Sequence, residues 1–164
     1  MAFAVHVAAQ SMERAARVGK RLRLLDVRMF EISGKIIDIR AADELQNVEE
    51  FSSRVGIELN EQVAAFNFHV DLTIKGVGGQ PAVDVSLRAA ALFEVLGGGP
   101  GGDVEVSEQG DFAAFGATTV QMIVFPYVRS AISELTMRLG CPPVTLDLLV
   151  LQEASGDSAD VEPS

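Results

Sequence analysis

The sequence lacks several residue types on which common functional classes depend. It has no tryptophan, one tyrosine, one cysteine and two histidines in 164 residues. The single cysteine, Cys141, cannot form an internal disulfide, and no Cys/His cluster has the spacing of a zinc site. The best apolar run, residues 122–127, is too short to span a membrane and contains Pro126. The N-terminus also lacks the basic region of a secretory signal, so we expect a cytoplasmic location.

Basic residues are scarce as well. The chain has 13 Lys and Arg against 23 Asp and Glu, a net charge of −10. Residues 1–40 hold eight of these bases and four of these acids, a local charge of +4, so the remainder carries −14. An acidic body repels phosphate backbones, which disfavours nucleic-acid binding. Such a charge attracts basic partners, or serves solubility alone.

The length and composition are those of one globular domain. Apolar residues make up 48% of the chain and charged residues 22%. We expect a single domain over residues 1–151. Residues 152–164 hold four acids and no base, which predicts a disordered tail.

The first two thirds of the chain read as one helix followed by strands. Small apolar residues at helical spacing predict a helix over 7–21. Alternation predicts strands over 22–39, 55–59, 66–74 and 83–95, the last two joined as a hairpin by a glycine-rich turn. The alternation slips after Met29, which predicts a bulge. Residues 41–53 read as a connection with one helical turn near 43–48.

The last third contains the second predicted helix. Residues 97–102 (GGGPGG) end the strand before it, 103–111 read as a polar segment and 112–115 as a short apolar turn. A helix is predicted from about Pro126 to Leu139, capped by Gly140 and ended by two prolines. A short apolar run follows at 144–151. The predicted fold is α+β: a four-stranded antiparallel sheet, a long C-terminal helix on one face and an N-terminal helix.

Nothing in the sequence indicates catalysis. The glycine runs lack the Gly-Lys-Ser/Thr ending of a phosphate-binding loop, and Asp103 would repel phosphate. His6 and His69 lie far apart in the sequence, Cys141 has no evident partner, and no pair of carboxylates stands out. We therefore predict a protein that is not an enzyme and needs no cofactor or metal. What remains is apolar: several phenylalanines lie in weakly structured segments, where they could form an adaptable groove or belong to the core.

One segment carries a family pattern. Gly116-Ala117, then Phe125-Pro126-Tyr127-Val128-Arg129, then Arg138 and Pro142-Pro143-Val144-Thr145-Leu146 resemble the C-terminal signature of the SecB family of export chaperones. The predicted strands also follow that family's order. The resemblance covers residues 22–151, and its specific part lies at 116–146.

The resemblance implies a homotetramer, built as a dimer of dimers, that holds non-native polypeptides without ATP and passes them to the SecA ATPase. We place client contacts on Phe51, Ile57, Leu59, Phe66 and Phe112, each of which has a place in the core as its alternative. We place oligomer contacts on Val128, Ile132, Leu135 and Leu139. The signature residues Phe125, Pro126, Tyr127, Arg129, Pro142 and Pro143 are expected to form the scaffold.

The sequence departs from the family pattern in three ways. No room remains for the family's helix after the proline-rich turn, Val27 stands where an acidic SecA contact is expected, and the N-terminal helix is an addition. With these departures, the sequence looks more like the solitary SecB-like chaperones, some of which protect the antitoxin of a toxin–antitoxin pair. Two alternatives stay open: an adaptor for one dedicated partner such as an antitoxin, and a carrier or enzyme with a cavity between sheet and helix.

Overall fold

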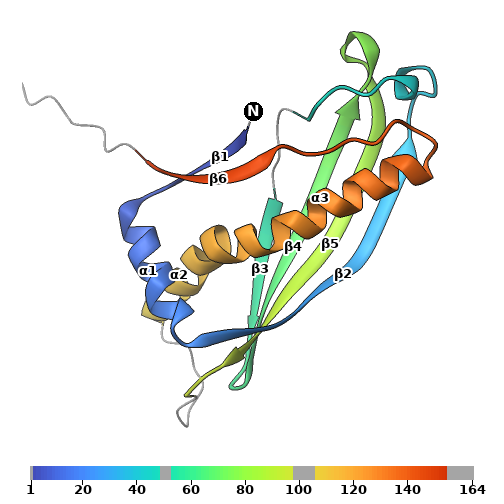
Figure 1. Cartoon of the computed structure of the whole chain (residues 1–164). Coiled ribbons are helices and arrows are strands. Elements are labelled where there is room, and N and C mark those ends of the chain that lie inside the picture. The colour runs from blue at the N-terminus through green and yellow to red at the C-terminus, as the bar shows by residue number, and fades with distance from the viewer. Residues whose placement is uncertain (1, 49–52, 98–105, 155–164) are drawn as a thin grey trace, which may run out of the picture.

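A computed structural model describes residues 2–48, 53–97 and 106–154 (Figure 1). The strands are β1 (Ala2–Val7), β2 (Leu22–Ile36), β3 (Ser53–Leu59), β4 (Val63–Lys75), β5 (Pro81–Val95) and β6 (Leu148–Glu153). The helices are α1 (Ala9–Gly19), α2 (Val106–Phe115) and α3 (Gln121–Arg138), with a π-helical segment, Gly116–Val120, between the last two. Short 3₁₀ turns cover Ala41–Asp43 and Val77–Gly79. Within the described residues, no helix is both long and apolar enough to cross a membrane.

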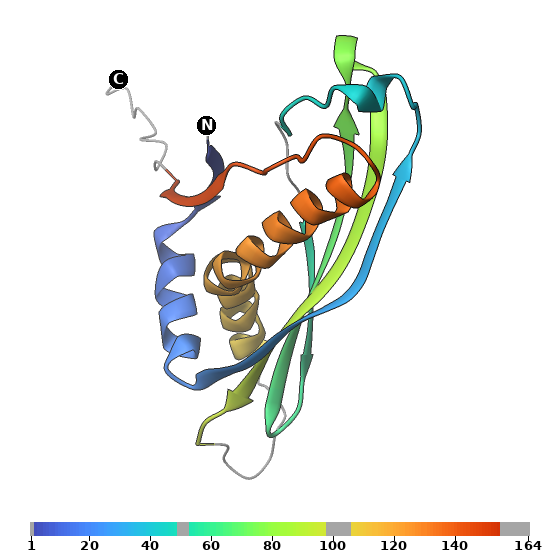
Figure 2. The same ribbon diagram turned by 45° about the vertical axis from the view of Figure 1, so that its right-hand side comes forward.

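Four of the strands form one antiparallel sheet in the order β2-β5-β4-β3. All three helices lie on the same side of this sheet, and α3 runs diagonally across it (Figure 2). The hairpin of β4 and β5 is present as predicted, with Gly78 and Gly79 in the left-handed conformation at its turn (φ 70° and 77°). The structure confirms the predicted α+β class and its four-stranded sheet.

The irregularity predicted in the first long strand is also present. The pairing of β2 with β5 shifts between Met29 and Glu31, where the apolar phase slips, and again between Leu24 and Asp26. Each bulge adds a residue on one side of the ladder, so Leu25 and Phe30 stay exposed (53% and 63%). The strand ends at Ile36, three residues earlier than predicted.

The core lies between the inner face of the sheet and the helices. Phe66, Phe93 and Phe115 meet edge to face there, with ring centroids 5.4–5.6 Å apart. Gly116 lets the π-helical segment approach the sheet, because a Cβ atom at this position would lie 3.0 Å from the Phe66 ring. Gly34 on β2 likewise lets α3 approach the sheet, because Leu135 and Leu139 pack directly over it.

The second helix is much longer than the sequence predicts. Residues 106–115, expected as a polar segment and an apolar turn, form α2, and Pro126 lies inside α3 rather than at its start. Proline removes one helical hydrogen bond at a cost of about 3 kcal/mol. Val124, Phe125 and Val128 are buried around it, so packing holds the helix together through the proline.

Two further strands, β1 and β6, were not predicted from the sequence. β1 and β6 pair in parallel as a separate two-stranded ribbon, from Ala2↔Leu148 to Val7↔Glu153. The apolar run at 144–151 thus continues into a strand, and Gln152 and Glu153 belong to it rather than to a tail. The predicted disorder of residues 155–164 lies outside the described residues.

Candidate functional site

Two of the five predicted client-contact residues belong to the interior. Phe66 is fully buried and Phe112 is 3% exposed. Both side chains are packed between sheet and helix, in the place in the core that was their alternative. Phe51 lies outside the described residues.

The other two predicted client residues lie on β3, an edge strand of the sheet. Ile57 and Leu59 point to the inner face together with Val55, which reaches Gly116. Leu59 is half-buried and Ile57 is 37% exposed. In the described part of the chain β3 pairs only with β4, so its second edge carries unpaired backbone groups beside partly exposed apolar side chains.

The predicted oligomer contacts face inward. Val128 and Ile132 are 2% and 0% exposed and pack into the core of the subunit itself. Leu135 and Leu139 are half-buried over Gly34 of the same chain. The helical period was read correctly, but a helix on a sheet turns its most apolar stripe toward its own sheet. The exposed apolar side chains of α3 are Met122, Tyr127 and Met137 (39%, 49% and 52%).

Several signature residues hold the C-terminal segment onto α3. The Arg129 Nε atom donates a hydrogen bond to the carbonyl oxygen of Leu146 (2.5 Å), which joins the two halves of the signature. The Phe125 ring meets Phe3 of β1 edge to face at 6.2 Å. Pro142 and Pro143 are exposed and start the return of the chain along the helix. These contacts position the β1–β6 ribbon.

A buried threonine completes this junction. The Thr136 hydroxyl donates to the carbonyl oxygens of Ile132 and Ser133 (3.1 and 3.0 Å) and accepts from the amide N–H of Val144 (3.0 Å). Gly140 follows the helix with φ 79°, the left-handed conformation predicted for its cap. Thr136 was not predicted as a functional residue, because a threonine inside a helix does not indicate which later segment of the chain will pack against it.

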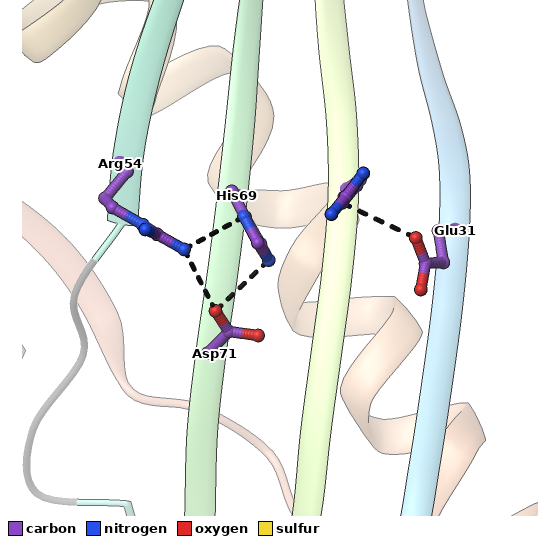
Figure 3. Close-up of polar contacts among 5 residues, drawn as sticks. Glu31, Arg54, His69 and Asp71 are labelled. Carbon is purple, nitrogen blue, oxygen red and sulfur yellow. Dashed lines mark hydrogen bonds and ion pairs between the residues drawn. The ribbon is translucent and has the colours of Figure 1, made fainter.

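The outer face of the sheet carries a polar network (Figure 3). One cross-strand row contains Arg54, His69, Arg88 and Glu31. Arg54 lies 3.1 Å from His69 Nδ1 and donates to Asp71 (3.3 Å), and His69 Nε2 lies 3.1 Å from the same carboxylate. A hydrogen bond from Ser86, together with the charges of His69 and Arg54, lowers the pKa of Asp71.

Asp71 is the shared partner in this network. Its carboxylate accepts a hydrogen bond from Ser86 and lies 3.1 Å from His69 Nε2. Among the described residues, no group of three or more His, Cys, Asp or Glu side chains is placed to hold a metal ion. The open hollow beside the network, about 690 Å³, is lined by Phe30, Gly56 and both arginines.

Cys141 is buried where the end of α3 meets the 41–43 turn. Burial raises the pKa of its thiol, and the nearby Asp43 carboxylate raises it further. A thiol held protonated in this way is a poor nucleophile.

The arrangement of sheet, diagonal helix and N-terminal helix matches a solved structure. The matching structure is that of the Rv1957 SecB-like chaperone of Mycobacterium tuberculosis, in complex with a ChAD peptide from the Rv1956 HigA1 antitoxin. The match covers 85% of this chain and 99% of that chain, with a TM-score of 0.70 and 22% sequence identity. The fold is that of a SecB-like chaperone. The likeness confirms the fold expected from the signature.

Other comparisons add little to the SecB-like assignment of the fold. A protein of unknown function from Streptococcus agalactiae matches 78% of this chain and 98% of its own, with a TM-score of 0.44 and 12% identity. No family model matches the chain. No curated protein matches it.

Proposed function

We propose that this protein is an ATP-independent chaperone that binds non-native polypeptides in extended form. The observation that carries the proposal is a SecB-like fold that leaves apolar side chains exposed beside unpaired strand edges. An exposed edge binds any extended chain through its backbone, and apolar side chains add about 25 cal/mol per Å² of buried area without sequence specificity. The proposal involves no catalysis and no cofactor.

The β3 edge is the first place at which we propose that clients bind. Ile57 and Leu59 offer apolar contacts on the inner side, and Gly56 leaves the opposite side open, with no other group within 4 Å of a Cβ built there. A client strand laid along β3 would extend the sheet from four strands to five. The acidic surface of the chain would attract clients with basic segments and keep the complex in solution.

We also propose that the protein is a homotetramer, a dimer of dimers. The 15-residue edge strand β2 exposes Leu24, Leu25, Phe30 and Ile32 (43%, 53%, 63% and 47%). A long apolar edge of this kind promotes aggregation unless something covers it. An antiparallel second copy of β2 centred on Val27 would pair Asp26 with the partner's Arg28, and the reverse. Exposed Met122, Tyr127 and Met137 on α3 would join two such dimers.

A dedicated partner is the second candidate function. The SecB-like chaperone with the matching fold was solved with an antitoxin peptide. The N-terminal helix and the β1–β6 ribbon of this chain would then serve one recurring sequence rather than many clients. We do not extend the proposal to hand-over to SecA, because Val27 replaces the acid expected on β2.

Aggregation of a chemically denatured model protein tests the proposal. After dilution from denaturant, a stoichiometric amount of this chain is expected to suppress the rise in light scattering without ATP. Unchanged light scattering over a range of molar ratios of this chain to the denatured protein would overturn the proposed holdase function. Affinity capture from the native host then separates the candidates: a broad set of unfolded chains indicates a holdase, and one stoichiometric protein indicates a dedicated adaptor.

A further inference from the structure

The β1–β6 ribbon carries exposed apolar side chains on the side that faces away from the core. Phe3 and Val5 of β1 and Leu149 of β6 pack against the core, and Val7 is buried at the end of β1. On the opposite side of β6, Leu148 is 61% exposed and Val150 is 39% exposed. β6 therefore reads Leu-Leu-Val-Leu, apolar on both faces, the pattern of a strand buried within a sheet.

The ribbon is also incomplete as a sheet. Parallel strands occur almost only inside larger, covered sheets, and a two-stranded pair is marginal by itself. In the described residues β6 pairs with β1 alone, so alternate backbone N–H and C=O groups of β6 point toward an unoccupied edge. The Arg129 and Thr136 contacts nevertheless fix this segment in place, so the edge is preorganised.

A recess lies at the end of the ribbon. It measures about 220 Å³ and is lined by Val7, Ala9 and Met12 on one side and by residues 151–153 on the other. Met12 of α1 is 44% exposed there. The recess is of a size to accept one large apolar side chain.

The charge around the ribbon indicates what could occupy it. Neither β1 nor β6 contains a lysine or arginine, and the sequence has no base after Arg138. Asp147 and Glu153 flank the four apolar residues of β6. A segment with apolar residues at alternate positions and basic residues at its ends complements this surface.

We propose that the free edge of β6 binds an extended client segment of this kind as a third strand of the ribbon. The backbone of the client segment forms hydrogen bonds with β6. Its apolar side chains pack beside Leu148 and Val150, and one of them enters the recess at Met12. This inference rests on the proposed polypeptide-binding function and adds to it a second binding edge, distinct from β3.

Peptide binding to the full chain tests it. The probe is a fluorescent twelve-residue peptide with valine or leucine at alternate positions and lysines at both ends, followed by anisotropy. Leu148→Thr with Val150→Thr keeps strand propensity but removes apolar area, and is expected to weaken binding about tenfold. Ile39→Thr with Val77→Thr, at two other exposed apolar positions (74% and 54%), is the matched control and is expected to change affinity less than about twofold.

Hydrogen exchange locates the bound strand. The peptide is expected to slow amide exchange at residues 148–153. A peptide N-methylated on the side that faces β6 is expected to give no such protection. If the peptide binds and the ribbon variant matches the wild type, with protection at 53–59 alone, the ribbon inference is wrong and the proposed function stands. If the wild type binds neither this peptide nor a denatured protein, the proposed function fails and the inference with it.

Discussion

Single residues at the end of α3 decide whether the C-terminal segment stays docked. Thr136 links the helix to Val144, and Arg129 links it to Leu146. Both bonds join a helix to a chain without regular structure, so no neighbouring ladder replaces them when they are lost. Arg129 belongs to the signature that resembles the SecB family, and this hydrogen bond supports the scaffold role that we predict for it.

Thr136→Val tests this role with almost no change of shape. The valine removes the acceptor of the buried Val144 N–H, and we expect unfolding to become easier by about 1–3 kcal/mol. Thr118→Val is the control, because the equally buried Thr118 hydroxyl donates to the Ala114 carbonyl (2.8 Å) and, among the described residues, accepts no bond from another segment. Urea denaturation of both variants measures the difference. Equal losses would contradict the proposed link.

Cys141 gives a second prediction at this scale. Because burial and Asp43 raise the pKa of its thiol, we expect alkylation by iodoacetamide at pH 8 to be at least about tenfold slower in the folded chain than in denaturant. The folded thiol keeps its proton to higher pH than the unfolded one, so the contribution of this group to stability is full at neutral pH and declines above the ordinary thiol pKa near 9. Mass spectrometry of timed samples follows the reaction, and equal rates would contradict the burial.

At the scale of elements, the sequence predicted the sheet better than the helices. Strands β3, β4 and β5 alternate strictly, so their faces and hairpin could be read directly, and the phase slip near Met29 located a real bulge. The start of the long helix could not be predicted, because a proline is typical of the first turn of a helix and the packing that keeps Pro126 inside α3 is not local. The ribbon was missed since parallel pairing of the two ends of the chain leaves no mark in either strand.

The candidate site could likewise be predicted only in part from the sequence. Period-two reasoning placed Ile57 and Leu59 on a strand, but it could not distinguish a covered face from an open one at Phe66. Helical period likewise identified the apolar stripe of Val128 and Ile132, but not that it faces the chain's own sheet. Which apolar face stays open depends on how far the diagonal α3 reaches over the sheet.

Gly76 fixes the connection that crosses the end of the sheet. A Cβ atom at Gly76 would lie 1.9 Å from the Ala41 carbonyl oxygen, so the 41–46 segment would have to move. We expect Gly76→Ala to destabilise the fold by about 1–3 kcal/mol. Gly56→Ala, on a strand with open space around it, is expected to be neutral or slightly stabilising. Thermal unfolding compares them, and a neutral Gly76→Ala would contradict this packing.

At the scale of the whole molecule, the proposed assembly follows from uncovered edges. The mass of one chain is 17.5 kDa, and light scattering in solution is expected to give about four times that value. Phe30→Lys with Ile32→Lys places charge on the exposed edge of β2 and is expected to halve the mass or reduce it further. Met12→Lys, exposed on α1, is the control and is expected to keep the wild-type mass. A monomeric wild type would contradict the assembly.

The central claim is that this acidic chain keeps strand edges and apolar side chains available to other polypeptides. The most direct measurement is chromatography with light scattering of the chain mixed with a permanently unfolded, reduced and carboxymethylated protein, compared with the same protein in its native form. We predict a stable complex with the unfolded form alone, formed without nucleotide. Separate elution of the two proteins at micromolar concentrations would contradict the claim.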